Sequence, residues 1–540
     1  MTNLSAYLGY AARAVGLGQA APIPGRTDMV PNNAGGYGFV LDDAARLDRF
    51  LILGSDGGTY YVNQAELTAQ NAAAVLRMLA ADGPATVARI AAVSEAGRAP
   101  RNTPALFALA LALRAADAPT RAAAEAALPR VARTGAHLLQ LVAMLDRLGG
   151  WSRSRRRAVG AWFAQRDADR LGWQALKYFQ REGFSLRDVL RLAHPKPATP
   201  AHAAVFDWIS GRTADAALLP ASLAARDALH AAVAAAADKG AVAAAFLALH
   251  ALPREALPSN VLDAPAVLRA LLPGMPMMAL LRALAVLTRH GVLAPGSAEA
   301  TSVAARLSDP VAVARARLHP FAVFLAAHTY ARGQGLRGRG TWVPVPEIVA
   351  ALELAFDAAF DGLVPTGKRL LVAVDVSGSM VAPVVGAPVS TADAAAAMAV
   401  ALARREPNAV VVTFDTAVRR GVFDPARLLV RDLAGERGGG TNLAQPVLWA
   451  SARSQAFDGI VVLTDNETWA GREHPAQALE NYRRRVNPAV RLVVAAMAAN
   501  HANVVDPTDA NSLGIAGLDA AVPALVAYFL GLPAPAAEEE

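Results

Sequence analysis

The chain has 540 residues and a net charge of +7, and it is too long for a single hydrophobic core, so roughly two to four domains are expected. It contains no cysteine, which excludes disulfides, cysteine-ligated zinc and thiol catalysis. The hydrophobic fraction of 54% comes largely from alanine, the best helix former, and no uninterrupted apolar stretch reaches the roughly 18 residues that suggest a membrane span.

The positive charge is unevenly distributed along the chain. Residues 1–365 contain 37 Lys+Arg against 27 Asp+Glu, whereas residues 366–540 contain 15 against 18. A basic excess over the first two-thirds of the chain indicates a polyanionic partner such as a nucleic acid. The alternative is that arginine is simply the preferred soluble residue of an Ala- and Arg-rich composition. Charge alone does not decide between the two.

The N-terminal region combines an arm with a glycine-rich segment. Residues 1–28 lack the basic start and continuous apolar core of a signal peptide, so we expect a cytoplasmic protein. Residues 29–62 contain "NNAGGYGF" and "GSDGGTYYV", two Gly-rich turns on either side of an amphipathic helical pattern. Composition alone does not explain this arrangement.

From about residue 64 to residue 360, apolar residues recur every three to four positions. This spacing predicts amphipathic helices in pairs, for example "TPALFALALALRAA" and "AHLLQLVAMLDRLGG", joined by short Pro/Gly breaks. Successive helical hairpins with one buried seam predict an α-solenoid, and the lack of a strict period indicates degenerate repeats of HEAT type. No strand is expected between these helices.

Basic side chains in this region are candidates for phosphate contacts. Lys177 and Arg181 are four residues apart and would share one face of a helix, although a solvated helix face also explains such a pair. His194 precedes a proline, so it is expected to end a helix, where it could cap carbonyl groups instead of touching a ligand.

Two further basic segments leave their role open. The run Arg153-Ser154-Arg155-Arg156-Arg157 is the densest cluster of positive charge and fits either a nucleic-acid patch or a solvated helix start. Arg337 and Arg339 lie in the loop "GLRGRG" near the expected domain junction. Aromatic residues make up only 6% of the chain, so base stacking is expected to be a minor contribution.

The pattern changes near residue 364. The expected strands are "RLLVAVD", "NAVVVTFD", "GIVVLTD" and "RLVVAAMA", and they alternate with expected helices at 390–406, 442–454, 475–486 and 520–531. Fully apolar short strands that alternate with helices predict a doubly wound, Rossmann-like parallel sheet covered on both faces.

Oxygen-bearing side chains follow the ends of these expected strands. Asp375 ends the first strand and is followed by Ser377 and Ser379, Thr441 follows "GGG", and Asp465 ends "VVLTD". Because ligands bind beyond the carboxyl ends of such strands, we expect these side chains to meet. Two carboxylates and three hydroxyls suit Mg²⁺ or Mn²⁺, with water completing the octahedron. The alternative is a tight loop with helix-capping serines.

The sequence offers no catalytic set. A phosphoaspartyl enzyme would need a second Asp two residues after Asp375, but that position is Ser377. There is no GxxxxGK[ST] loop, no G-x-S-x-G elbow and no nucleophile with an evident base. We therefore expect that the protein is not an enzyme.

The oxygen-bearing set resembles a known metal site. In order and spacing, Asp375-x-Ser377-x-Ser379, Thr441 and Asp465 are similar to the metal-ion-dependent adhesion site of a von Willebrand factor A domain. In that family the metal keeps an open position, which accepts a carboxylate from a partner protein.

The rest of the chain resembles the TROVE module of the Ro autoantigen family. The similarity lies in "NNAGGY" and in segments 177–197, 275–288 and 317–338. It covers about residues 29 to 530 and implies a closed ring of HEAT-like helical repeats, joined at its ends by the A-type domain. The implied division is an N-terminal arm at 1–28, the ring at 29–363, a von Willebrand factor A-like domain at 364–532 and an acidic tail at 533–540.

The resemblance also implies a function in non-coding RNA quality control. Members of this family hold small structured Y RNAs on the outer ring and single-stranded 3′ ends of misfolded RNAs in the central hole, and bacterial relatives work with 3′-to-5′ exoribonucleases such as polynucleotide phosphorylase. Lys177, Arg181 and His194 match family positions that contact Y RNA. The alternative is an adaptor that binds a protein carboxylate through its A-type domain and ignores RNA.

Overall fold

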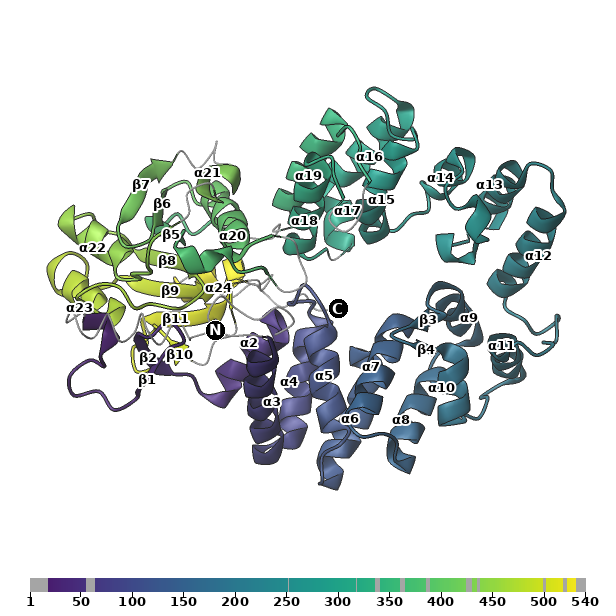
Figure 1. Ribbon diagram of the computed structural model, residues 1–540, viewed down its shortest axis with the longest axis horizontal. Coiled ribbons are helices and arrows are strands. Elements are labelled where there is room, and N and C mark those ends of the chain that lie inside the picture. The colour runs from purple at the N-terminus through teal and green to yellow at the C-terminus, as the bar shows by residue number, and fades with distance from the viewer. Residues whose placement is uncertain are drawn as a thin grey trace, which may run out of the picture.

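The computed structural model describes residues 18–54, 64–250, 252–316, 318–335, 340–359, 365–384, 389–423, 430–434, 438–498, 502–517 and 522–530. The second Gly-rich turn beyond Gly54, the loop with Arg337 and Arg339, and the acidic tail lie outside these residues. Figure 1 shows a helical part that curves away from a sheet domain and returns to it. Among the described helices, none combines the length and apolarity that a membrane span requires.

The helical part consists of short amphipathic helices packed side by side. Many of them begin at a Ser, Thr or Asp whose side chain accepts a backbone N–H, as Asp82, Thr134 and Ser152 do, which explains where the chain turns into helix. In chain order they are α2 (Asp43–Leu53), α3 (Gln64–Ala81), α4 (Gly83–Glu95), α5 (Thr103–Ala112), α6 (Ala118–Val131), α7 (Gly135–Arg147), α8 (Arg153–Ala164), α9 (Ala168–Lys177), α10 (Leu186–Ala193), α11 (Pro200–Ser210), α12 (Ala221–Ala235), α13 (Lys239–His250), α14 (Pro265–Leu271), α15 (Met277–Arg289), α16 (Ala298–Ser308), α17 (Pro310–Arg315), α18 (Pro320–Ala331) and α19 (Pro346–Ala358).

The two ends of this helical path meet. His319, at the start of α18, has its Nε2 atom 3.0 Å from the carbonyl oxygen of Arg98, which lies 221 residues earlier in the loop after α4. The first helix, α2, packs against the sheet domain at β11 (Ser512–Ala516), and the path returns to that domain after α19 (Figure 1). The predicted ring of helical repeats closed by an α/β domain is therefore confirmed.

A small hairpin interrupts the helices and corrects one prediction. Strands β3 (Gln180–Arg181) and β4 (Phe184–Ser185) pair antiparallel between α9 and α10. The two turn residues, Glu182 and Gly183, have φ of 53° and 82°, the left-handed conformation that a tight two-residue hairpin turn requires. The expectation of no strand here is wrong, and Lys177 and Arg181 do not share a helix face because α9 ends at Lys177.

The sheet domain contains a six-stranded sheet with the order β11-β9-β8-β5-β6-β7. Neighbouring strands run parallel except β7, an edge strand that returns antiparallel to β6 and was not predicted. The strands besides β11 are β5 (Leu370–Asp375), β6 (Ala409–Phe414), β7 (Val418–Phe423), β8 (Gly459–Thr464) and β9 (Arg491–Ala496), and the helices are α20 (Thr391–Arg405), α21 (Val430–Ala434), α22 (Gln445–Ala452), α23 (Pro475–Arg485) and α24 (Val522–Phe529).

Both faces of the sheet are covered, which confirms the doubly wound prediction. Along β5, Leu370, Val372 and Val374 join the core that contains α20, whereas Leu371 and Ala373 join the core that contains α22 and α23. Strand residues point alternately to the two faces, so an unbroken apolar run is needed where helices lie on each side. Strand β5 lies between β6 and β8, which places its carboxyl end where the strand order reverses.

Residues 18–40, which we call the N-terminal strap, dock on the sheet domain. Strand β1 (Met29–Pro31) pairs with β2 (Tyr37–Val40), and β2 pairs with β10 (Ala502–Asn503). This three-stranded sheet joins the segment before the ring to the sheet domain, as the contact between dark purple and yellow segments in Figure 1 shows. Its strands were not predicted, because they are short and because β2 pairs with β10 more than 400 residues away.

Candidate functional site

The five predicted metal-site residues meet at the carboxyl edge of the sheet. Asp375 is the last residue of β5, Asp465 follows the adjacent strand β8, and Ser377 Oγ lies 3.2 Å from Ser379 Oγ in the turn after β5. The backbone N–H of Gly378 donates to the carbonyl oxygen of Gly439 at 3.2 Å, which brings this turn beside the Gly-rich segment that leads to Thr441. All five side chains are buried, with exposed fractions of 3% or less.

The two carboxylates raise the free energy of the cluster when no cation is present. Burial raises the pKa of Asp375, and burial followed by the charge of Asp375 raises the pKa of Asp465. Hydrogen bonds oppose these shifts: Asp375 accepts from the backbone N–H of Ser377 at 2.9 Å and from Thr464 Oγ1 at 2.6 Å. A bound divalent cation would compensate both negative charges.

The donor set fits a hard divalent cation. The hydroxyl oxygen of Thr441 is buried and has no hydrogen-bond partner among the residues that the structure describes, so it could serve as a ligand. Within the described residues, no group of three or more His, Asp or Glu side chains could hold a metal, so hydroxyls must complete the set. Two carboxylates with three hydroxyls match the oxygen preference of Mg²⁺ and Mn²⁺.

Sequence reasoning missed two carboxylates beside this cluster. Asp415 follows β6, is buried, and accepts from Arg419 and from the backbone N–H of Ala417 at 3.0 Å. It could have been found, because it ends an apolar strand as Asp375 and Asp465 do.

The second missed carboxylate is Glu467, which is fully buried two residues after Asp465. Burial and then the charge of Asp465 raise the pKa of Glu467 to about 8, while hydrogen bonds from Asn33 and Ala34 act in the opposite direction. No local pattern could have found this residue, since its partners lie in the strap, more than 430 positions away.

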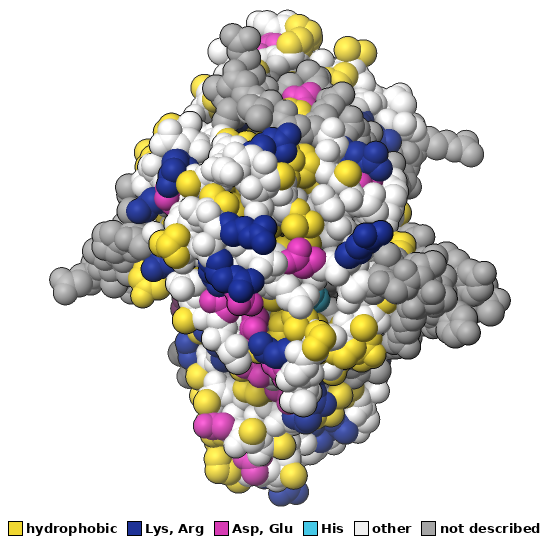
Figure 2. All heavy atoms as spheres, turned by 90° about the vertical axis from the view of Figure 1, so that its left-hand side faces the viewer, with side chains coloured by type: hydrophobic (Ala, Val, Ile, Leu, Met, Phe, Trp, Pro, Cys, Tyr) yellow, Lys and Arg dark blue, Asp and Glu magenta, His cyan; other side chains and the backbone are white. Residues whose placement is uncertain are grey.

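The outer surface of the sheet domain carries charges of both signs. Figure 2 shows the face of this domain that points away from the helical ring, where Lys and Arg side chains lie among Asp and Glu side chains. Several of the domain's arginines are paired, such as Arg369 with Asp458 at 2.8 Å and Arg483 with Asp509 at 2.7 Å. This pattern does not match a broad polyanion-binding surface.

A basic groove lies in the helical ring, between the start of α8 and the segment that follows α10. It has a volume of about 430 Å³, and the small residues Gly160 and Ala161 of α8 also line it. Its basic side chains come from two segments that are about 40 positions apart in the sequence: Arg153, Arg156, Arg157, His194 and Lys196.

The cations of this groove are exposed and mostly unpaired. Arg157 pairs with Glu125 at 3.1 Å, but Arg153, Arg156 and Lys196 form no ion pair with any residue that the structure describes. His194 ends α10 with a left-handed backbone (φ 46°), which is rare for residues other than glycine and which turns the chain before Pro195. The helix end predicted at His194 is therefore correct, and its side chain lines the groove.

Of the three residues expected to contact RNA, only His194 lines this groove. Lys177 is half-buried at the end of α9, with its Nζ atom 5.7 Å from the centre of the Tyr178 ring. Arg181 is exposed on β3, and its Nε atom lies 4.0 Å from the carboxylate of Glu182. The sequence marked the Arg153–Arg157 run and His194 separately, and the tertiary structure brings them together.

Comparisons with known proteins match nearly the whole chain. The TROVE domain matches residues 30–216 and 250–329, and the Ro60 vWA domain matches residues 369–530. A relative from Deinococcus radiodurans named RNA-binding protein RO60 is 40% identical over 508 residues, which cover 93% of this chain and 95% of the relative. A protein of the same name from Caenorhabditis elegans is 30% identical over 581 residues, which cover 93% and 90%.

The fold comparison agrees with the sequence comparisons. The crystal structure of the Deinococcus radiodurans RO (RSR) protein superposes with a TM-score of 0.67 at 38% identity, and the match covers 90% of this chain and 99% of that one.

Proposed function

Because this chain belongs to the Ro family, whose members combine a TROVE domain with a Ro60 vWA domain, we propose that it binds RNA through its helical ring. The names of the two relatives describe RNA binding. The observation that carries the proposal is the groove between α8 and the end of α10, in which five basic side chains surround a space of about 430 Å³.

The groove suits the phosphate backbone of a structured RNA. Arg153 and Arg156 lie at the start of α8, where the helix dipole also favours an anion. Lys196 and His194 face them from the other wall. Phosphate contacts of this kind depend strongly on salt and read little base sequence, so the shape of the RNA would decide what binds.

The finer proposal is a role in non-coding RNA quality control. A small structured, Y-like RNA would bind along the groove, with Lys177 and Arg181 as additional contacts. Single-stranded 3′ ends of misfolded RNAs would enter the centre of the ring, because an unpaired strand is thinner than a duplex. A 3′-to-5′ exoribonuclease such as polynucleotide phosphorylase would be the partner that uses such a 3′ end, in the cytoplasm.

The proposed cofactor is Mg²⁺ or Mn²⁺ at the strand edge of the sheet domain. Asp375 and Asp465 would supply the charge and the hydroxyls of Ser377, Ser379 and Thr441 would complete the protein ligands, a role for which the unpartnered Thr441 oxygen is suited. When bound, the ion would offer an electrophilic position to a carboxylate of a protein partner. An adaptor that lacks RNA binding remains the alternative, and the basic groove argues against it.

A paired set of charge-removing variants tests the groove. Arg153→Ala with Arg156→Ala removes two unpaired cations, and we expect the slope of log K against log salt to fall by roughly 1.4–1.8, or about 0.7–0.9 for each phosphate that is no longer neutralised. The matched control is Arg130→Ala with Arg269→Ala, which removes the same charge from arginines that already pair with Glu95 and Glu299.

The measurement is an electrophoretic shift of a small hairpin RNA at several salt concentrations. If the groove variant and the control bind with the same affinity and the same salt slope, RNA does not use the groove. The variant Lys177→Ala with Arg181→Ala, measured alongside, shows whether the bound RNA extends to the β3–β4 hairpin.

A further inference from the structure

The motif "NNAGGYGF" has no part in the basic groove, and the structure places it beside the candidate metal ligands instead. Asn32 donates from Nδ2 to the carbonyl oxygen of Thr468 at 2.7 Å, and Asn33 donates from Nδ2 to Oε1 of Glu467 at 2.9 Å. Glu467 and Thr468 belong to the loop that begins with Asp465. The strap therefore holds a loop that carries one of the two metal-site carboxylates, 434 positions away in the sequence.

A third strap residue, Gln19, reaches the other ligand loop. Gln19 is fully buried, and its Nε2 atom donates to Oδ1 of Asn442 at 2.7 Å. Asn442 directly follows Thr441. The Oε1 atom of Gln19 accepts from Thr468 Oγ1, so one side chain of the strap links the Thr441 loop to the Asp465 loop.

The strap approaches these loops so closely that its shape matters. The side chain of Asn32 accepts from the backbone N–H groups of Ala34 (3.1 Å) and Gly36 (2.8 Å), which fixes the turn. A Cβ atom on Gly36 would lie 1.9 Å from the carbonyl oxygen of Thr468, so only glycine permits this contact.

The contacts of the strap also stabilise the buried carboxylate of Glu467. Within the described residues, the side-chain hydrogen bonds that Glu467 accepts come from the strap, namely from Asn33 Nδ2 and from the N–H of Ala34 at 3.3 Å. If the strap left, a buried carboxylate beside Asp465 would be deprived of these donors, which is costly in a dry site. The position of the Asp465 loop therefore depends on the strap.

We infer that the N-terminal strap is a support of the metal site, in which Gln19, Asn32 and Asn33 position the loops that carry Thr441 and Asp465. Metal binding and strap docking then strengthen each other by the same factor, because coupling between two binding events is reciprocal. The inference rests on the proposed metal site and names residues that lie outside the set of five ligands.

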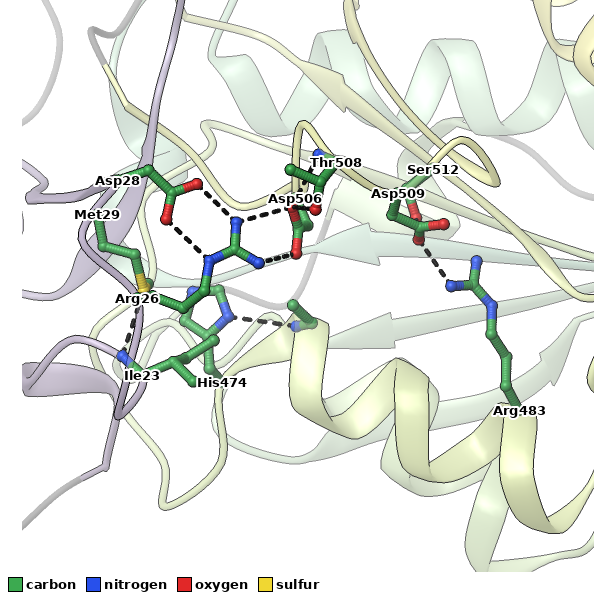
Figure 3. Close-up of polar contacts among 11 residues, drawn as sticks. Ile23, Arg26, Asp28, Met29, His474, Arg483, Asp506, Thr508, Asp509 and Ser512 are labelled. Atoms are coloured by element: carbon green, nitrogen blue, oxygen red, sulfur yellow. Dashed lines mark hydrogen bonds and ion pairs between the residues drawn. The ribbon is translucent and has the colours of Figure 1, made fainter.

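A separate clamp keeps the strap in reach of the loops. Figure 3 shows Arg26 between Asp28 and Asp506, with Nη1 of Arg26 2.5 Å from Asp506 and Nη2 2.6 Å from Asp28. The strap continues directly into α2, the first helix of the ring, which packs on β11. A metal ion that tightens the strap would therefore also hold the start of the ring on the sheet domain.

Two variants of the full-length chain test this support. Asn33→Asp keeps the size of the side chain but places a second carboxylate against Glu467, and Gly36→Ala inserts a methyl group into the Thr468 contact. We expect either variant to bind Mn²⁺ roughly 10- to 100-fold more weakly in calorimetry, the range known for groups that orient metal ligands. Val40→Ala is the control, since Val40 lies in the strap with half of its surface exposed.

Hydrogen exchange of the wild-type protein gives the reciprocal measurement. Backbone amides of residues 29–40 should exchange several-fold more slowly with saturating Mn²⁺ than with a chelator. The inference would be overturned if both variants bound Mn²⁺ with wild-type affinity. It would also be overturned if the exchange rates of the strap amides in the wild type were the same with Mn²⁺ and with a chelator. If calorimetry showed no Mn²⁺ binding to the wild-type protein, the metal site itself would be refuted, and the inference with it. The proposal that the ring binds RNA would not be affected by that result.

Discussion

The helical ring and the sheet domain place their functional charges differently. In the ring, Arg153 and Arg156 are exposed at the start of a helix, and no described carboxylate pairs with them. In the sheet domain, Asp375 and Asp465 are fully buried at a strand edge, next to hydroxyls that complete a small oxygen-lined cluster. Both regions are charged, yet they suit ligands of very different size.

If the proposed function is right, burial is the property that selects the ligand in each region. Exposed cations interact with a large polyanion at a distance and are screened by salt, so they favour extended, sequence-tolerant binding. Buried carboxylates cannot reach a large ligand, and leaving them uncompensated is costly, so they favour a small divalent cation. The two regions should therefore respond independently to substitution, and the following predictions test that independence.

The largest effect is expected for Asp375→Ala, which removes a buried carboxylate from the strand edge. We expect the Mn²⁺ isotherm to disappear in calorimetry, while the affinity for a hairpin RNA stays within about twofold of wild type, because the basic groove lies in the ring. Asp458→Ala is the matched control, because it removes a carboxylate that pairs with Arg369 at the opposite end of β8. If Asp375→Ala binds Mn²⁺ as tightly as wild type does, the metal does not bind at this cluster. If Asp375→Ala lowers the affinity for RNA as well as for Mn²⁺, the two regions are not independent.

The next effect concerns pH, because each region holds a histidine whose pKa is lowered by burial, fully buried in the case of His474 and half-buried in the case of His137. Burial lowers the pKa of His474, under the strap, to about 4, and it lowers the pKa of His137, in α7, to about 4 as well. Between a pH of about 6.5 and a pH of about 4, the unfolded chain takes up a proton that the folded chain does not accept, so stability falls as the pH falls through this window. Each histidine should account for about 3 kcal/mol over the whole window.

Urea unfolding at a series of pH values checks this expectation. His474→Asn keeps a side chain that can accept from Ala476 N–H, as the Nδ1 atom of His474 does at 3.2 Å, and should flatten the acid dependence. His137→Asn should do the same for the ring. Variants whose stability falls with pH as steeply as that of the wild type would show that these imidazoles are not the groups that titrate.

The smallest effect is expected inside the ring part itself. An RNA duplex with a single-stranded 3′ tail should compete roughly tenfold better than a blunt duplex with the same number of phosphates, a difference of about 1.4 kcal/mol, because the thinner tail can enter the centre of the ring and make additional contacts there. Competition binding near physiological salt is the suitable measurement, since low salt strengthens non-specific contacts. If the two duplexes competed equally well, the central passage would not bind single-stranded RNA. The basic groove would then be the proposed RNA-binding surface.

Much of the architecture could be predicted because its signals are local. The alternation of apolar runs and helical patterns after residue 364 is enough to predict a doubly wound sheet, and the rule that ligands meet at the carboxyl ends of parallel strands places Asp375 and Asp465 together. The three- to four-residue spacing before residue 360 likewise predicts the helices of the ring. Each of these inferences needs only neighbouring residues and a general rule of packing.

The amino-acid sequence was therefore enough to predict the fold of each region and to place Asp375 and Asp465 at one edge of the sheet. The folded structure was needed to show that Arg153 and His194 line one groove, that Arg181 lies on a hairpin, and that the strap holds the Asp465 loop through Asn33. The cause of this division is distance along the chain. The groove and the strap contact join segments that are about 40 and 434 positions apart, and the hairpin depends on the backbone of the turn residues Glu182 and Gly183. The periodicity of a sequence does not encode which distant surfaces come together when the ring closes.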